Sequence, residues 1–142
     1  MKNIRLWILA GLLLISTVLF VDWFRAESNL KNINISVSAD PSTIIADGKN
    51  QSILTVHVTE NGRPRVNDLM QSYLSSGSGL LIPQWAFTDQ NGIARITYTP
   101  TPFSPYDPTN GVVIVVLDTN IGRIIEVDKE QIVEVKLQAP AQ

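Results

Sequence analysis

The residues that commonly carry catalysis or bind metal ions are few and scattered in this sequence. It contains one histidine, His57, and no cysteine. A hydrolytic triad needs a nucleophile, a base and an orienting group within reach of one another, and no pattern around His57 supplies them. Zinc sites need several Cys or His ligands. The sequence therefore predicts no catalytic residue and no zinc site.

Carboxylates are the remaining candidate metal ligands. Five of them lie near expected turns: Asp40, Asp47, Asp89, Asp107 and Asp118. None has the dense Asp-x-Asp spacing of a calcium loop, and aspartates at turns commonly accept local backbone hydrogen bonds. The glycine-containing segment 75–79 lacks the Lys-Ser/Thr pair of a phosphate-binding loop. We expect no metal, no cofactor and no enzymatic activity.

Length and charge restrict the class of protein further. The chain has 142 residues and a formal net charge of −2, with a pI near 5.3. A protein that binds nucleic acid needs a basic stripe to neutralise phosphates, whereas the Lys and Arg residues here are scattered. Beyond an apolar N-terminus there is room for one domain of roughly 110 residues, which can bury a sufficient core without disulfides.

The N-terminal segment 4–24 is almost continuously apolar. About 20 such residues span a hydrocarbon core as a helix, so we expect one transmembrane helix. Its candidate membrane-contacting residues are Trp7, Leu12, Leu13 and Trp23. Lys2 and Arg5 precede the span, which predicts a cytoplasmic N-terminus and an extracytoplasmic or periplasmic domain at a bacterial inner membrane.

A cleaved signal peptide is the alternative to an uncleaved signal anchor. Its apolar region would be shorter, about 7–15 residues, and would end at a small-x-small site. The candidate site Phe24-Arg25-Ala26 instead begins with a bulky residue, which favours the anchor. Asp22 is the one acidic residue in the segment, and we expect it at the outer interface beside Arg25. The polar residues 27–32 are predicted to form a short linker.

Alternation of apolar and polar residues, the period of a strand with one buried face, predicts several strands after the linker. The central one follows the turn Asp89-Gln90-Asn91-Gly92, in which Asn91 and Gly92 can both adopt positive φ as a short hairpin turn requires. A run that is apolar on both faces predicts a central strand or one covered by another subunit. The segments are 33–39, 44–45, 54–58, 93–99, 112–117 (the run), 124–127 and 132–137.

The segment 67–84 is ambiguous between a loop, a helical turn and a strand. Leu69, Met70, Tyr73 and Leu74 would fall on one face of a helix. The flexible residues 75–79 follow, and 80–85 is expected to rejoin the sheet.

Three turn motifs, in this order and spacing, resemble the bacterial Ig-like domains of invasin and intimin-type surface proteins. They are Ala46-Asp47-Gly48, Asn61-Gly62-Arg63-Pro64, and Thr88-Asp89 leading to Asn91-Gly92-Ile93-Ala94. The resemblance covers about residues 33–137. It implies an all-β, immunoglobulin-like β-sandwich with a structural or binding role, and it brings no catalytic residue. The sequence therefore divides into an anchor (1–26), a linker (27–32), the sandwich (33–138) and a tail (139–142).

Three groups of residues are candidates for contact with a partner. The first two lie in or beside loops, where exposed apolar groups mark interfaces. The alternative for the first group is that it fills the sandwich core, and the alternative for the second is that it forms a rigid connector packed on its own domain. The third is the segment 131–138, a candidate edge strand that an added strand could pair with. The residues are Leu80, Leu81, Ile82 and Trp85; Phe103 and Tyr106; and Val135.

The function that these features favour is structural. A compact extracytoplasmic domain close to the bilayer, with no catalytic chemistry, suits a subunit that docks on other proteins of an envelope assembly such as a secretion, conjugation or pilus machine. The alternative is an adhesin-like or ligand-binding module at the cell surface. The expected partners are thus the membrane and other envelope proteins.

Overall fold

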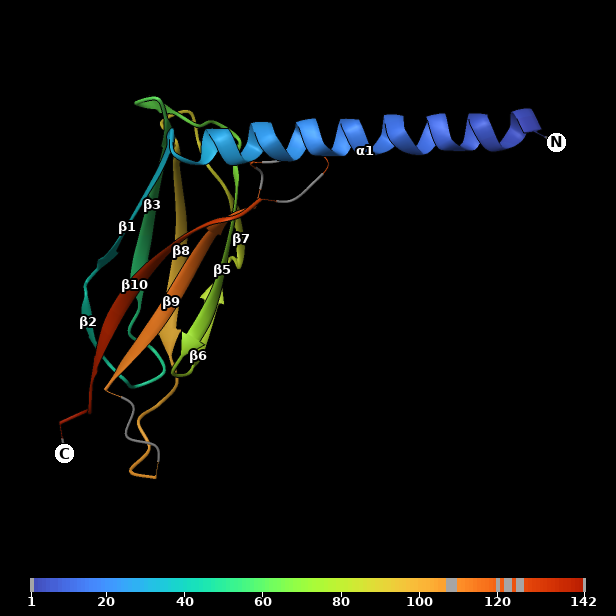
Figure 1. Cartoon of the computed structure of the whole chain (residues 1–142). Helices are drawn as coiled ribbons and strands as arrows, with labels where there is room; N and C mark the ends of the chain where they lie inside the picture. Colours follow the sequence, from blue (N-terminus) through green and yellow to red (C-terminus); the bar gives the residue numbers. More distant parts are fainter. Residues whose placement is uncertain (1, 107–109, 120, 122–123, 125–126, 142) are drawn as a thin grey trace.

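The computed structural model describes residues 2–106, 110–119, 121, 124 and 127–141. It contains one long helix, α1 (Lys2–Leu30), which leads into a β-sandwich. Figure 1 shows α1 extending sideways from one end of the sandwich, nearly at right angles to its long axis. The helix segment Ile4–Leu30 is long and apolar enough to cross a membrane.

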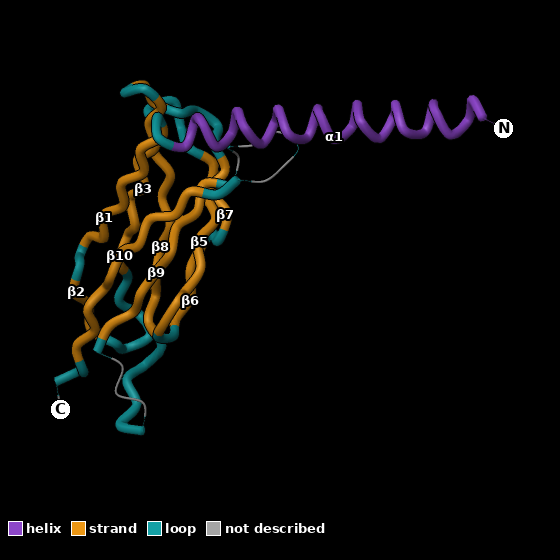
Figure 2. The backbone as a smooth tube through the Cα atoms, in the orientation of Figure 1, coloured by secondary structure: helices purple, strands orange, loops and turns teal. Residues whose placement is uncertain are grey.

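The described part of the sandwich contains ten strands in two sheets. Sheet A has the order β1-β3-β8-β6, with the short β4 paired to β3, and sheet B has the order β2-β10-β9-β5-β7. Figure 2 shows the two layers of strands in the same orientation as Figure 1. The strands are β1 (Ile33–Asp40), β2 (Thr43–Ile45), β3 (Ser52–Glu60), β4 (Arg63–Pro64), β5 (Leu69–Ser76), β6 (Gly79–Ile82), β7 (Trp85–Phe87), β8 (Ile93–Pro100), β9 (Gly111–Asp118) and β10 (Lys129–Gln138).

The core lies between the sheets and is built by the predicted alternation. On β3, Leu54, Val56 and Val58 are fully buried, while His57 is exposed. Strand β9 is central, between β10 and β5, as its apolar run predicted. Burial of large aliphatic side chains stabilises a fold by about 1.5–3 kcal/mol each, so these strands hold the sheets together. The immunoglobulin-like sandwich behind one helix is confirmed.

The chain passes from one sheet to the other at two prolines. Strand β1 pairs with β3 in sheet A, and after Pro41 strand β2 pairs in parallel with β10 in sheet B. Likewise β6 pairs with β8 in sheet A, and after Pro83 strand β7 pairs with β5 in sheet B. Proline has no backbone N–H to give to a ladder, so each ladder ends there. The predicted segment 80–85 is thus two strands in different sheets.

The turn at Asp89–Gly92 differs from the predicted hairpin turn. Gly92 has a φ of 72°, but Asn91 is absent from the described residues with positive φ. The Gly92 N–H donates to the Asp89 carbonyl at 2.9 Å, and the Asp89 carboxylate accepts from the backbone N–H groups of Asn91 and Ile93 at 2.8 and 3.0 Å. The turn joins β7 of sheet B to β8 of sheet A, so it is a crossover between layers and no hairpin.

The helical alternative for Leu69–Leu74 was wrong: these residues belong to β5. Met70 and Ser72 are buried, and Tyr73 is exposed. β5 pairs with β9 on one side and with β7 on the other. The two ladders satisfy the backbone of β5, and the small Ser72 fits the inner face, so pairing with distant strands decides a pattern that is ambiguous in isolation.

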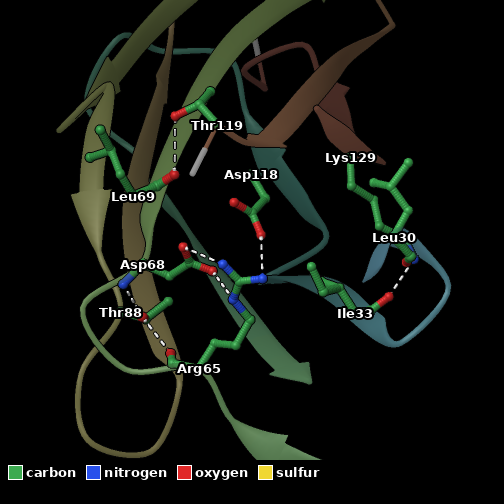
Figure 3. Close-up of polar contacts among 9 residues, drawn as sticks. All are labelled: Leu30, Ile33, Arg65, Asp68, Leu69, Thr88, Asp118, Thr119 and Lys129. Carbon is green, nitrogen blue, oxygen red and sulfur yellow. Dashed lines mark hydrogen bonds and ion pairs between the residues drawn. The ribbon is translucent and has the colours of Figure 1, made fainter. Parts of the chain in front are cut away.

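A buried ion cluster ties the connections at one end of the sandwich together (Figure 3). The Arg65 guanidinium contacts Asp68 through two nitrogens, Nε to Oδ2 at 2.6 Å and Nη2 to Oδ1 at 3.1 Å. Its Nη1 lies 3.9 Å from Asp118 Oδ2 at the end of β9. The Thr88 hydroxyl donates to the Arg65 carbonyl and accepts from the Asp68 N–H. The segment 65–68 is thereby joined to the ends of β7 and β9.

The helix enters the sandwich almost directly. The segment expected as a linker is helical as far as Leu30, and only a turn at residues 31–32 separates α1 from β1. The Lys129 ammonium on β10 donates to the carbonyls of Leu30, at 2.8 Å, and Ile33. A cation there complements the negative end of the helix dipole. From the helix side, the Asp22 carboxylate accepts from the Ile124 N–H at 2.9 Å.

Candidate docking surfaces

The outer face of sheet B carries an apolar strip that we call the sheet-B face: Tyr73, Val115, Leu117 and Ile132. Val115 on the central strand lies directly opposite Tyr73 on one side and Ile132 on the other. Val115 is only 4% exposed, while Tyr73 and Ile132 are 42% and 54% exposed. Directly opposed side chains in a sheet contact one another, so the two outer residues flank Val115 and leave their own far sides open.

The outer face of sheet A is different in composition. Its central row runs from Ser36 through His57 to Ile93, and the next row pairs Thr55 with Arg95. A sheet with one solvated face carries polar residues there. The two central rows of sheet A follow this rule better than the central row of sheet B, although Ile53 is exposed on sheet A and Glu130 and Glu134 are exposed on β10 of sheet B. Figure 1 shows sheet B nearer the viewer, with α1 lying across the view. The sheet-B face therefore points sideways with respect to the helix axis.

A second apolar surface, the β6–β7 edge, is formed where both sheets end. Its members are Leu80 and Ile82 of β6 and Trp85 and Phe87 of β7, all between 50% and 61% exposed. Leu80, Ile82 and Trp85 are sequence candidates, and they lie on the edge strands of the two sheets. By alternation Leu80 and Ile82 project from the outer face of sheet A, and Trp85 projects from the outer face of sheet B. Leu81 is instead buried in the core, because it alternates with its exposed neighbours.

Phe87 is a surface residue that sequence reasoning missed. The alternation Trp85-Ala86-Phe87, with Ala86 buried, is the signal that could have found it. Tyr73 was missed because it was considered only as part of a possible helical face, and Ile132 because it was counted only as an apolar member of its strand.

The proline-rich candidates lie apart from both surfaces. The Phe103 N–H donates to the Ala46 carbonyl at 2.7 Å, which fastens this part of the segment to the sandwich. Tyr106 is almost fully exposed. The segment 101–106, which carries both residues, follows β8 and lies at the end of the sandwich opposite α1 (Figure 1). The rest of the predicted proline loop, residues 107–109, lies outside the described residues, as do 125–126 of the predicted strand 124–127.

The predicted edge strand 131–138 is covered in part by β2, and the side chain of Val135 does not lie on the surface. Its side chain is fully buried, and it pairs with Val112 of β9. Beyond β10 lies β2, which pairs with its last residues, Lys136 to Gln138. The Lys136 N–H donates outward to Ser42, so by the alternation of a strand the backbone of Val135 faces β9. A proline at 135 would therefore break the sheet itself.

The four predicted membrane residues, Trp7, Leu12, Leu13 and Trp23, all lie exposed on α1. Large apolar side chains exposed along a whole helix are costly in water. Their exposure matches a helix whose surroundings are apolar.

The ionisable groups with shifted pKa values are explained by local structure. Backbone N–H groups of Ile93 and Asn91 lower the pKa of Asp89, and those of Asn50 and Lys49 lower the pKa of Asp47. Burial raises the pKa of Tyr98 to about 12, and its hydroxyl donates to the Ser78 carbonyl at 2.8 Å. Within the described residues no group of three or more His, Cys, Asp or Glu side chains could hold a metal ion.

Comparison with known proteins identifies solved structures with a similar fold. No protein-family model matches the chain, and no curated protein is similar to it in sequence. Among solved structures, it is similar to a C-terminal fragment of intimin in complex with the intimin-binding domain of the translocated intimin receptor (24% identity, TM-score 0.56, 73% of this chain and 33% of that chain).

Two other intimin structures match as well. They are the D00-D0 domains (22% identity, TM-score 0.52, 69% and 45% covered) and the D0-D1 domains (20%, 0.50, 70% and 47%). The chain thus spans less than half the length of each of these three intimin structures. What these likenesses establish is the fold: the domain behind α1 is an immunoglobulin-like β-sandwich of the kind found in intimin.

Proposed function

We propose that this protein is a non-enzymatic, membrane-anchored structural subunit whose extracytoplasmic Ig-like domain docks on other proteins of an envelope assembly, such as a secretion, conjugation or pilus machine. Helix α1 is the anchor, and its basic N-terminus lies in the cytoplasm of a bacterium. The sandwich then lies on the outer side of the inner membrane.

The observation that carries the proposal is the unequal composition of the two outer faces. The sheet-B face exposes Tyr73 and Ile132 around Val115, whereas the equivalent positions of sheet A include Thr55, His57 and Arg95. Contiguous exposed apolar surface marks protein interfaces, and aromatic residues are enriched in their centres. Because this face points sideways from the helix axis (Figure 1), a neighbour standing in the same membrane can reach it.

The test uses photo-crosslinking in native membranes. A photoreactive amino acid replaces Ile132 in one full-length variant and His57 in a matched control, since both lie mid-strand and exposed on opposite outer faces. We expect discrete cross-linked protein bands from position 132 and none from position 57. Mass spectrometry of the bands would name the partner.

Two results would overturn the proposal. The first is the absence of an adduct at position 132 together with a monomeric protein in mild detergent. The second is binding of the isolated domain to host cells or glycans that does not depend on the helix, because that behaviour belongs to an adhesin-like module.

A further inference from the structure

We propose that the β6–β7 edge lies on the outer surface of the same bilayer that α1 crosses, with Trp85 and Phe87 in the boundary between lipid headgroups and acyl chains. The occupant of this surface is lipid, and the sheet-B face remains free for protein. The inference rests on the anchoring role of α1 in the proposed function and assigns a second, separate contact.

The first support is a long segment without charge. From Leu69 to Thr88 the chain has no Asp, Glu, Lys or Arg, although such residues number 24 in the whole sequence (13 acidic and 11 basic). This segment forms β5, β6 and β7. Edge strands are usually protected from unwanted pairing by charged side chains, and both β6 and β7 are edge strands. Their lack of charge indicates that another surface covers them.

The second support is the orientation of the sandwich. Only residues 31–32 separate α1 from β1, and the contacts of Lys129 with Leu30 and of Asp22 with Ile124 fasten the helix to the hairpin of β9 and β10. The sandwich therefore has little freedom to turn about the helix. Figure 1 shows β5, β6 and β7 on the side of the sandwich toward which α1 extends. In a membrane crossed by α1, this side faces the lipid.

The third support is the distance that the helix provides. A span of about 20 residues, or about 30 Å, fills the hydrocarbon core. Counted from Ile4, that span ends near Trp23, and the helix ends at Leu30, about 10 Å further on at 1.5 Å per residue. The headgroup region on each side is roughly 5–8 Å thick. The sandwich therefore begins where the headgroups end, within reach of a side chain.

The side-chain types agree with a lipid occupant. Tryptophan is enriched at membrane interfaces, where its ring is apolar and its N–H remains near water. Trp85 would reach into the headgroups just outside the level of Trp23 of α1, next to the interface of the helix.

The test measures the depth of spin labels in the full-length protein reconstituted in lipid nanodiscs. The chain has no cysteine, so single cysteines can be labelled without other changes. The variants are Phe87→Cys and Ile82→Cys at the edge, Leu13→Cys in α1, and Ile53→Cys as a control, because Ile53 is similarly exposed on the outer face of sheet A. Collision rates with oxygen, which enters lipid, and with a water-soluble nickel complex report depth.

We expect the labels at 87 and 82 to collide more with oxygen and less with nickel than the label at 53, and the label at 13 to lie deepest. Labels at 87 and 82 that are as open to nickel as the label at 53, with 13 still in lipid, would overturn the inference and leave the anchor intact. Edge labels shielded from both reagents would also overturn it, because they would indicate contact with protein. A label at 13 in water would refute the anchor, and with it the proposed function.

Discussion

Replacing Arg65 by methionine should be the most damaging single change outside the apolar core. The side chain of Arg65 is 16% exposed, and its carboxylate neighbours Asp68 and Asp118 are 2% and 0% exposed. Methionine preserves much of the volume but removes the cation that faces both carboxylates. Removal of one partner from a buried ion pair costs about 3–5 kcal/mol.

The structure narrows this range. Asp68 loses a two-nitrogen contact, whereas the contact with Asp118 is a longer one at 3.9 Å, and the guanidinium is partly open to water. We therefore expect a loss near the lower end, about 3–4 kcal/mol. Domains of this size have total stabilities of about 5–15 kcal/mol. At roughly 4 °C per kcal/mol, the melting temperature should fall by about 12–16 °C.

The assay is urea unfolding of the full-length protein in detergent micelles, followed by near-UV circular dichroism. Arg63→Met is the matched control, because Arg63 is an exposed arginine on the neighbouring strand β4 and surface substitutions usually change stability by less than 0.5 kcal/mol. Adding Asp68→Asn and Asp118→Asn to the Arg65→Met variant should recover part of the loss. A loss below about 1 kcal/mol for Arg65→Met would refute the reasoning, because removal of one partner from a buried ion pair destabilises a protein by more than that.

Three further changes test the turn and the ionisable groups. Gly92→Ala should destabilise the protein more than Gly62→Ala in urea unfolding. Both glycines have positive φ, which strains alanine by about 1–3 kcal/mol. Only at position 92 would the new Cβ also clash with a backbone atom, the Val58 carbonyl oxygen, at 2.4 Å. Because hydrogen bonds hold the pKa of Asp89 below its ordinary 3.8 in the folded state, its contribution is present above that value and is lost as the pH falls through the folded pKa. Asp89→Asn should therefore make stability fall less as the pH drops below about pH 4, and an unchanged acid slope would contradict this. The pKa of Tyr98 is raised from 10.0 to about 12 in the folded state, so its contribution to the free energy of unfolding is fully present below pH 10 and is lost as the pH rises to 12. Tyr98→Phe should therefore make stability depend less on pH over that window. A slope equal to that of the wild type would show that Tyr98 does not titrate there.

Local alternation was sufficient to predict the strands that present one face to the core. Three apolar residues of β3 are spaced two apart, so the pleat of the strand turns all three toward the core: Leu54, Val56 and Val58. The central position of β9 also followed from the sequence, because Val115 on its outer face is as apolar as the residues on its inner face.

What local patterns could not determine is which strands pair. Leu69–Leu74 satisfies a helical face and a strand equally, and its assignment depends on β9, whose paired residues lie 40 to 48 positions further along the chain. The three residues of β2 are too short to signal a partner, yet their pairing with β10 removes part of the edge that we predicted around Val135. The turn after Asp89 has the residues of a hairpin, but the strands on its two sides belong to different sheets.

The candidate surfaces show the same limit. Trp85 and Ile82 could be named as candidates because they are apolar and lie beside loops. The sequence alone could not show that Leu81 is buried while Leu80 and Ile82, on either side of it in β6, are exposed. The absence of charge from residues 69–88 is visible in the sequence. Its meaning depends on the fold, because only the fold shows that the segment supplies the edge strand of each sheet on one side of the sandwich.

The joint between α1 and the sandwich determines which way each of these surfaces points. A domain on a long flexible linker samples all orientations, so no side of it has a constant environment. Here the turn at 31–32 and the contacts of Lys129 and Asp22 hold the sandwich in one orientation. Under the two proposals each side then has a constant neighbour: lipid for the β6–β7 edge and protein for the sheet-B face. Loosening the joint, for example by inserting glycines between Leu30 and Ile33, should thus weaken cross-linking from Ile132 without unfolding the domain, since the faces themselves would be unchanged.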